Sequence, residues 1–293
     1  MLQHSQLLQL VVISFLAAAS ISDLRKREVP NWVNYGLITT GFGLSLLHSA
    51  ITFNWSFALF SVIGAVAALV LAAIMFYTGQ WGGGDSKLLI GMGAALGLKS
   101  SITWPFSSLD SPFISFLFNL VLVSLAYAVV WGAILAFKHK KKFGAAFRKQ
   151  LESYAVIRKV VFVACGLGLV VALVSGDVLV RFAALGMAAI SFLTLYLSIM
   201  SKAVERACLL KSLSPLKLTE GDWIAKDVVV GGKRICGPKD LGIDKVQIRK
   251  LIAFYRRKKI RVVLVKEGLP FAPTFLIAYV ATVFFGNMFV MFL

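Results

Sequence analysis

The chain has few charged residues, and this scarcity excludes an ordinary soluble domain. Over 293 residues, charged side chains make up 15% and hydrophobic ones 59%, against roughly 25% and 45–50% in a typical soluble domain. Apolar runs recur along the chain, many of them close to the roughly 20 residues that cross a bilayer as a helix. The sequence therefore predicts an all-α polytopic membrane protein.

Cysteine and histidine are scarce as well, with three of each. Cys165, Cys208 and Cys236 lie far apart and form no C-x-x-C pair, which excludes a disulfide framework and argues against a zinc or redox site. The histidines are equally scattered. We therefore expect no metal cluster and no cofactor.

Acidic residues are outnumbered by basic ones, 13 to 31, and the formal net charge is +18. In a soluble protein this excess would indicate a nucleic-acid partner. Here the basic residues lie between apolar runs, with Lys99 and Arg181 as the exceptions to an alternating pattern. This distribution is typical of positive-inside topology and of contact with anionic lipid headgroups. We expect membrane lipids and no nucleic acid as partners, with both termini outside and the basic loops cytoplasmic.

Eight apolar segments are predicted to be transmembrane helices. The fourth is short and contains Gly91, Gly93 and Gly97, which fits an interior helix with close neighbours. The first resembles the core of a signal peptide but has no basic region before it, so we expect a retained helix. The predicted segments are 6–22, 31–49, 57–77, 86–99, 113–137, 158–175, 178–200 and 271–292.

A small cytoplasmic α/β module is predicted before the last helix, over residues 211–269. Its pattern indicates a strand over 223–230, a turn at Gly231 and Gly232, a strand over 233–236, a basic helix over 245–257 and a strand over 260–265. The expected domain plan is a membrane domain over 1–137, a basic stretch over 138–157, a helical pair over 158–200, the module, and the last helix over 271–293. The basic stretch fits an interfacial helix or a solvated loop equally well.

Four acidic residues lie near expected cytoplasmic helix ends, where a carboxylate beside the membrane needs an explanation. Basic neighbours explain Glu28 and Glu205 as ion-pair partners. Asp85 also has a structural interpretation, as the N-cap of the fourth helix. Asp23 closes the first helix, where a negative charge opposes the helix dipole. Asp23 and Asp85 are therefore the two candidates for chemistry.

Two carboxylates at the same membrane depth can together hydrolyse a peptide bond, as in aspartyl hydrolysis. When they share a site, one keeps its proton while the other activates water. Gly82, Gly83 and Gly84 precede Asp85, and we expect them to adopt conformations closed to other residues and to let a peptide backbone approach. Lys87 either biases Asp85 toward ionisation or anchors the helix at the interface, and the anchor is favoured.

These residues resemble the two motifs of the type IV prepilin peptidases. Asp23 and Pro30-Asn31 fit the pattern D-x6-P-N, and Gly82 to Asp85, followed by Lys87, fit GxGD with its Lys-Leu. The resemblance covers about residues 6–135. It implies a membrane aspartic endopeptidase that clips the short basic leader of pilin-like precursors at the cytoplasmic face. Asp23 and Asp85 would be the catalytic pair, and Gly82, Gly83, Gly84, Lys87, Pro30 and Asn31 would bind substrate or support the motifs.

The tail from Glu220 to Pro273 resembles archaeal prepilin and preflagellin peptidases, whose substrates are pilin or archaellin precursors. Bacterial bifunctional members carry an N-terminal methyltransferase domain, whereas this chain begins at its first helix, so we expect no N-methyltransferase activity.

Two other functions fit the same residues. An ion-coupled membrane transporter would use Asp23 and Asp85 as cation sites, since glycine-rich broken helices and interfacial acids suit that role. Against it, the chain shows no inverted repeat, and the acids lie at the membrane edge. The third hypothesis is a catalytically idle assembly factor of a pilus system.

Overall fold

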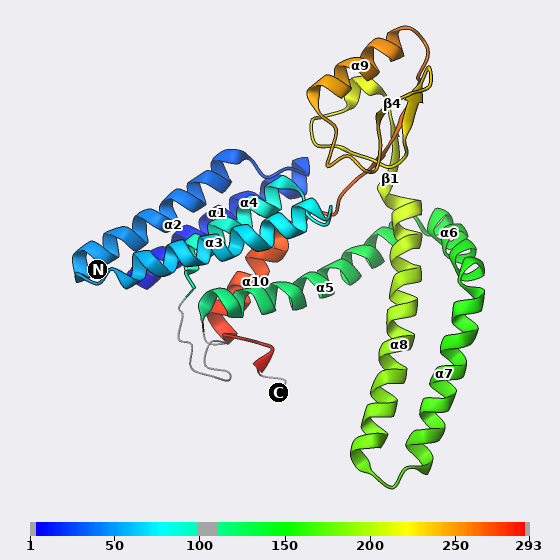
Figure 1. The fold of residues 1–293 in the computed structure, drawn as a ribbon, viewed down its shortest axis with the longest axis horizontal. Helices are drawn as coiled ribbons and strands as arrows, with labels where there is room; N and C mark the ends of the chain where they lie inside the picture. Colours follow the sequence, from blue (N-terminus) through cyan, green and yellow to red (C-terminus); the bar gives the residue numbers. More distant parts are fainter. Residues whose placement is uncertain (1–3, 99–110, 291–293) are drawn as a thin grey trace. The chain divides into compact units, whose positions relative to one another are not determined.

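The structure, a computed structural model, describes residues 4–98 and 111–290. The chain divides into two compact units, Met1–Val129 with Gly268–Leu293, and Val130–Glu267. Within its described residues the first unit holds six helices, of which α5 continues into the second unit (Figure 1). They are α1 His4–Lys26, α2 Asn31–Thr52, α3 Ser56–Tyr77, α4 Gly83–Leu96, α5 Pro112–Lys138 and α10 Ala272–Phe285.

Helix α4 lies in the interior of the first unit. The backbone of Gly93 passes so close to Gly64 on α3 that an added Cβ would overlap the Gly64 carbonyl oxygen. On the other side, a Cβ on Gly41 of α2 would lie 2.9 Å from the backbone nitrogen of Ala95. Glycine at these positions lets the helices approach closely, and the interior position predicted for the fourth segment is confirmed.

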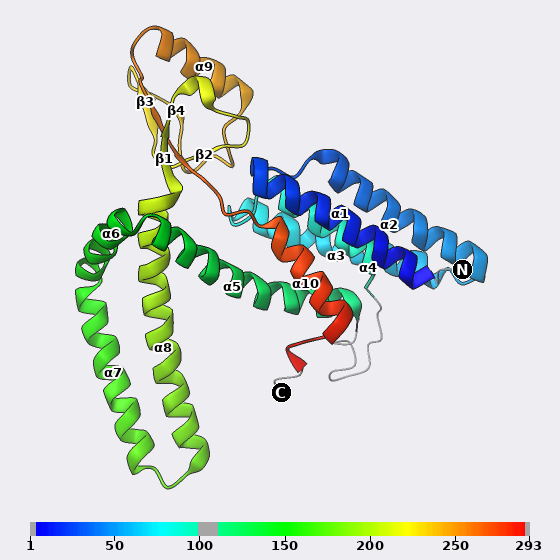
Figure 2. The ribbon, with the colours of Figure 1, turned by 180° about the vertical axis from the view of Figure 1, so that it is seen from behind.

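Helix α10 packs beside α1 and α5, although it is the last helix in the sequence (Figure 2). Asn119 of α5 fixes the C-terminal end of α10. Its Nδ2 donates to Thr282 Oγ1 at 2.9 Å and to the Gly286 carbonyl at 2.7 Å, while its Oδ1 accepts from Met288 N at 3.0 Å. Inside an apolar bundle these bonds satisfy the end of a helix that would otherwise expose polar backbone.

Each of the eight predicted segments contains a helix, although the last helix ends at Phe285 rather than at residue 292, and Lys99 and residues 291 and 292 lie outside the described residues. Only five of the described helices are long and apolar enough to cross a membrane. These five are α1, α3, α5, α7 and α8. Helices α4 and α10 have 14 residues each, and α2 contains polar residues such as Asn34 and His48. Eight membrane spans therefore remain a prediction. The basic stretch is a helix, α6 Lys140–Ser153, rather than an irregular loop.

The second unit joins a helical pair to the predicted α/β module. Helices α7 Ala155–Val174 and α8 Val178–Val204 pack against each other, and a π-helical turn, Glu205–Leu209, ends α8. A three-stranded antiparallel sheet follows, in the order β1-β5-β2, with β1 Leu210–Leu213, β2 Trp223–Ile224 and β5 Val263–Lys266. Hairpin β3 Val228–Val230 and β4 Lys233–Cys236 and helix α9 Lys245–Arg256 complete the module around a small apolar core.

The module corrects three details of the sequence prediction. The single strand expected over 223–230 is two strands in different sheets, because the chain bends at Ala225 and Lys226 and Asp227 then pairs with Arg234, with Nε to Oδ1 at 2.7 Å. The last strand begins at Val263 rather than at residue 260, and β1 was not predicted. The turn at Gly231 and Gly232, both with positive φ, and the basic helix are confirmed.

Cys236 reports on the stability of this module. Its side chain is fully buried, and this burial raises the pKa of its thiol from 9.0 to about 11. The folded state therefore favours the neutral Cys236 thiol. The stability that the buried neutral thiol contributes is fully present below pH 9 and is lost as the pH rises through 11. In a C165S/C208S background, we expect iodoacetamide to label Cys236 at pH 8 only after denaturation. Rapid labelling of the folded protein at pH 8 would contradict this burial.

Candidate active site

Asp23 lies in the last turns of α1, and its side chain is 6% exposed. The chain reverses just after the helix, where Arg27 has φ of 59° and its N–H donates to the Asp23 carbonyl at 2.9 Å. The Ser22 hydroxyl donates to the Glu28 carbonyl at 2.9 Å. These bonds fold residues 27–30 back over the end of α1 and leave the Asp23 carboxylate facing the bundle.

The carboxylate of Asp23 is held by α10. Its Oδ2 accepts from the backbone N–H of Ala272, the first residue of α10, at 2.9 Å. A helix N-terminus offers unpaired N–H groups and a partial positive charge, both of which favour a carboxylate. This contact offsets the unfavourable position of Asp23 at the C-terminal end of α1.

Asp85 is the third residue of α4, and the N-cap of this helix is Gly82. The interpretation of Asp85 as the N-cap is therefore wrong, although a carboxylate in the first turn still has a favourable interaction with the helix dipole. Asp85 is half-buried, and its charge interacts with that of Asp23. The structure thus brings the two aspartates, 62 positions apart in the sequence, within electrostatic range of each other in one unit.

The three glycines before Asp85 do not adopt the conformations that we expected. Gly82 has φ of −76°, and neither Gly83 nor Gly84, both within the described residues, has a positive φ. A Cβ on Gly84 would lie 3.3 Å from Cβ of Val29 in the loop before Pro30. The absence of a side chain at Gly84 therefore lets the start of α4 lie close to this loop.

Lys87 and Asn31 connect the two motifs directly. Lys87 Nζ donates to Asn31 Oδ1 at 2.9 Å and lies 5.5 Å from the centre of the Tyr35 ring. Pro30 is the N-cap residue of α2, with extended backbone, and Asn31 begins the helix. Lys87 is thus tied to the other motif, a contact that the interpretation as an interfacial anchor did not include.

Sequence reasoning missed an aromatic cluster beside the aspartates. The ring of Trp81 lies 5.5 Å from that of Phe271 and 5.9 Å from that of Phe275, between centroids. Phe271 and Phe275 contact each other at 5.7 Å, and Phe275 also contacts Phe116 of α5 at 6.0 Å. Pro270 and Pro273 are typical of a helix start, but nothing in the sequence pairs this helix start with Trp81.

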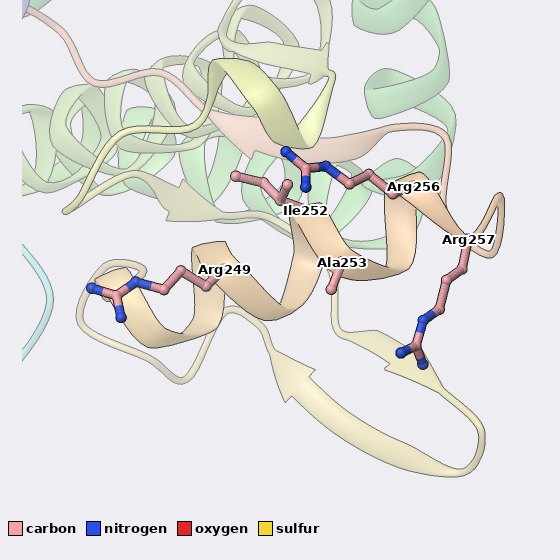
Figure 3. Close-up of a pocket in the computed structure, with 5 residues that line it drawn as sticks. All are labelled: Arg249, Ile252, Ala253, Arg256 and Arg257. Atoms are coloured by element: carbon pink, nitrogen blue, oxygen red, sulfur yellow. The ribbon is translucent and has the colours of Figure 1, made fainter.

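Two hollows elsewhere in the described chain lack this chemistry. One of about 420 Å³ lies on α9 and is lined by Arg249, Ile252, Ala253, Arg256 and Arg257 (Figure 3). Its lining has no acid or nucleophile that could hydrolyse a peptide. The other, of about 380 Å³, lies between α1 and α2 and is lined by aliphatic residues, threonines and a glycine. Among the described residues, no three His, Cys, Asp or Glu side chains are grouped to hold a metal ion.

Comparison with known proteins identifies relatives for the N-terminal part of the chain. Residues 10–137 match the type IV leader peptidase family. Preflagellin peptidase of Methanococcus voltae is 36% identical over 81 residues, 28% of this chain and 34% of that protein. Those of Methanococcus maripaludis and Methanocaldococcus jannaschii are 35% and 33% identical, over 27% and 28% of this chain and 34% of each protein.

This chain spans about a third of the length of the relatives that it matches. No solved structure matches it. The matched segment contains both aspartates, both motif loops and most of α5. Residues 10–137 of this chain are therefore similar to the type IV leader peptidase family, and the relatives named here are archaeal preflagellin peptidases, the branch that the sequence predicted.

Proposed function

We propose that this chain is a membrane-embedded aspartic endopeptidase that removes the short basic leader from pilin-like or archaellin precursors. The observation that carries the proposal is the pairing of Asp23 and Asp85, two carboxylates from separate motifs whose charges interact at the ends of α1 and α4. The family match and the name preflagellin peptidase, borne by the three relatives, support this substrate class.

The proposed reaction uses the pair as one proton-sharing unit. The ionised carboxylate takes a proton from a water molecule, whose oxygen attacks the carbonyl carbon of the scissile peptide. The protonated carboxyl donates its proton to the carbonyl oxygen, which gives a neutral tetrahedral intermediate. The intermediate collapses when its C–N bond breaks: the leaving nitrogen takes the proton from the carboxyl that had accepted it from water, and a hydroxyl of the intermediate returns its proton to the other, ionised carboxylate, which restores the pair with one proton. Since one carboxyl must be protonated and the other ionised, the rate should have a bell-shaped dependence on pH.

The remaining motif residues have supporting roles in this proposal. Gly82 leaves open space beside Asp85, since the nearest atom to an added Cβ is Asp85 Oδ2 at 3.8 Å, and an extended peptide backbone could lie there. The bond between Lys87 and Asn31 holds the two motif loops at a fixed separation. Pro30 sets the extended backbone at which α2 begins.

The site is proposed to lie at the cytoplasmic face of the cell membrane, with both chain termini outside. The loop that follows Asp23 carries Arg25, Lys26 and Arg27, and basic loops remain in the cytoplasm. Anionic lipids are the proposed surroundings of these residues. The proposal covers leader removal only, and the absence of methyltransferase activity stays a prediction.

The test is cleavage by the purified full chain in liposomes. The probe is a precursor with a basic leader that ends in glycine, followed by an apolar helix and a C-terminal tag. We expect a tagged product that lacks the leader, identified by mass and by N-terminal sequencing, and no product from a precursor whose junction glycine is replaced by valine. Failure to cleave precursors of both the pilin and the archaellin type would reject the proposal.

A further inference from the structure

The first turn of α10 contacts both segments that carry an aspartate. The Ala272 N–H donates to Asp23 Oδ2 at 2.9 Å. One residue earlier and three residues later, Phe271 and Phe275 pack against Trp81, which lies in the loop that leads into Asp85. A single turn of helix thus touches the end of α1 and the loop before α4, and Figure 2 shows α10 beside α1.

This turn has one well-defined arrangement. Ala272, Thr274 and Phe275 are fully buried. The Thr274 N–H and hydroxyl both donate to the Phe271 carbonyl, at 2.9 and 2.7 Å. Pro273, the second residue of the helix, has a fixed φ and no N–H of its own. Of the first two residues of α10, Ala272 is therefore the one that can donate a backbone hydrogen bond to Asp23, and the packing of the turn sets the direction of this N–H.

We propose that residues 271–275 are a positioning element of the aspartate site, which holds Asp23 through the Ala272 N–H and the start of α4, which carries Asp85, through Trp81. The inference rests on the proposed peptidase function. These residues lie outside the segment that matches the family, residues 10–137, so the part of the chain after the module completes the site.

The physical reason is the glycine content at the start of α4. Three consecutive glycines, at the N-cap and in the first turn of α4, separate Trp81 from Asp85, and glycine makes a helix less stable than other residues do. The contacts of Trp81 with Phe271 and Phe275 fix the residue that precedes this turn. A misplacement of about 1 Å in a catalytic group can lower the rate by about a hundredfold, so loss of this contact should reduce turnover.

The experiment compares Trp81→Leu and Phe275→Leu with the control variant Phe289→Leu. The control removes another aromatic contact of the same unit, the stacked pair of Phe118 and Phe289 at 5.2 Å, beyond the other end of α10. For each full-length variant in liposomes, kcat, KM and the pH profile are measured on the precursor and normalised to folded protein. Thermal unfolding is measured in parallel.

We expect kcat to fall by about ten- to a hundredfold in Trp81→Leu and Phe275→Leu, with KM within about twofold and a shifted pH profile. The double variant should lose clearly less than the product of the two single losses, because both changes remove the contact between Trp81 and Phe275. Trp81→Phe, which keeps an aromatic ring, should recover most of the rate. Phe289→Leu should stay within about twofold of the wild type.

Two results would overturn the inference while leaving the proposed function intact. In the first, Trp81→Leu and Phe275→Leu have the wild-type kcat and pH profile per folded molecule and only their thermal stability is lowered. The aromatic cluster would then contribute to packing alone. The other is an equal loss of kcat in Phe289→Leu. If the wild type itself cleaves no precursor, the peptidase proposal fails and this inference fails with it.

Discussion

Replacement of either Asp23 or Asp85 by asparagine is expected to lower kcat for leader removal by about a thousandfold or more. Asparagine neither takes a proton from water nor supplies one to a carbonyl oxygen, so each change removes one half of the pair. The fold should survive, because an asparagine at position 23 keeps a side-chain oxygen for the Ala272 N–H. Cleavage is measured in liposomes at matched amounts of folded protein.

The matched control is Asp177→Asn. Asp177 is the N-cap of α8, where its Oδ1 accepts from Leu179 N at 2.7 Å. Asparagine caps helices about as well as aspartate, so this variant should cleave at the wild-type rate. Cleavage within tenfold of wild type by either site variant would contradict the pairing of Asp23 with Asp85. Ion flux lost in both variants while cleavage continues would favour the transporter hypothesis instead.

Gly93→Ala is expected to destabilise the first unit by about 1–3 kcal/mol or more. The added methyl group would overlap the Gly64 carbonyl oxygen and lie 2.6 Å from Cβ of Ala68, and backbone atoms cannot rotate away as a side chain can. The matched control is Gly43→Ala on α2, where an added Cβ meets nothing within 4 Å. Alanine is a better helix former than glycine by about 1 kcal/mol, so the control should be neutral or slightly stabilised.

These two variants therefore shift the thermal unfolding temperature in opposite directions or by clearly different amounts. Unfolding is followed by circular dichroism in one detergent at one protein concentration. Equal unfolding temperatures for Gly93→Ala and Gly43→Ala would show that α3 and α4 do not meet at Gly64 and Gly93. Because α4 carries Asp85, Gly93→Ala should also lower the cleavage activity per folded molecule.

Most helices of this protein could be predicted because they form in apolar runs, and the basic helix α9 could be predicted from its pattern of apolar and basic residues. Whether each helix spans the membrane could not be predicted in the same way. The answer depends on the length of the helix in the folded chain and on polar residues such as Asn34 and His48 in α2. The module shows the same limit. Strand β5 pairs with both β1 and β2, one of them more than fifty residues earlier, and local patterns do not encode such partners.

The aspartates could be predicted because each lies in a compact motif. The environment of the two aspartates could not be predicted, because its residues are far apart in the sequence. Ala272 is 249 positions from Asp23, and Phe271 is similarly distant from Trp81, whose ring it contacts. The glycines before Asp85 illustrate a different error. Glycine can be selected for an unusual φ or for the absence of a side chain, and the sequence does not distinguish these reasons. At Gly84 the φ is not positive and an added Cβ would lie 3.3 Å from Cβ of Val29, which favours the second reason.

The hydrogen bond from Ala272 to Asp23 also has a consequence for biosynthesis. Proteins are made from the N-terminus, at about 5–20 residues per second, so α1 and α4 exist while α10 is still to be made. Asp23 lacks its backbone donor until residue 272 has left the ribosome and α10 has packed against α1. A chain that stops within the module would contain both aspartates and both motifs without the helix that holds Asp23, so under the proposed function such an incomplete product would cleave precursors slowly.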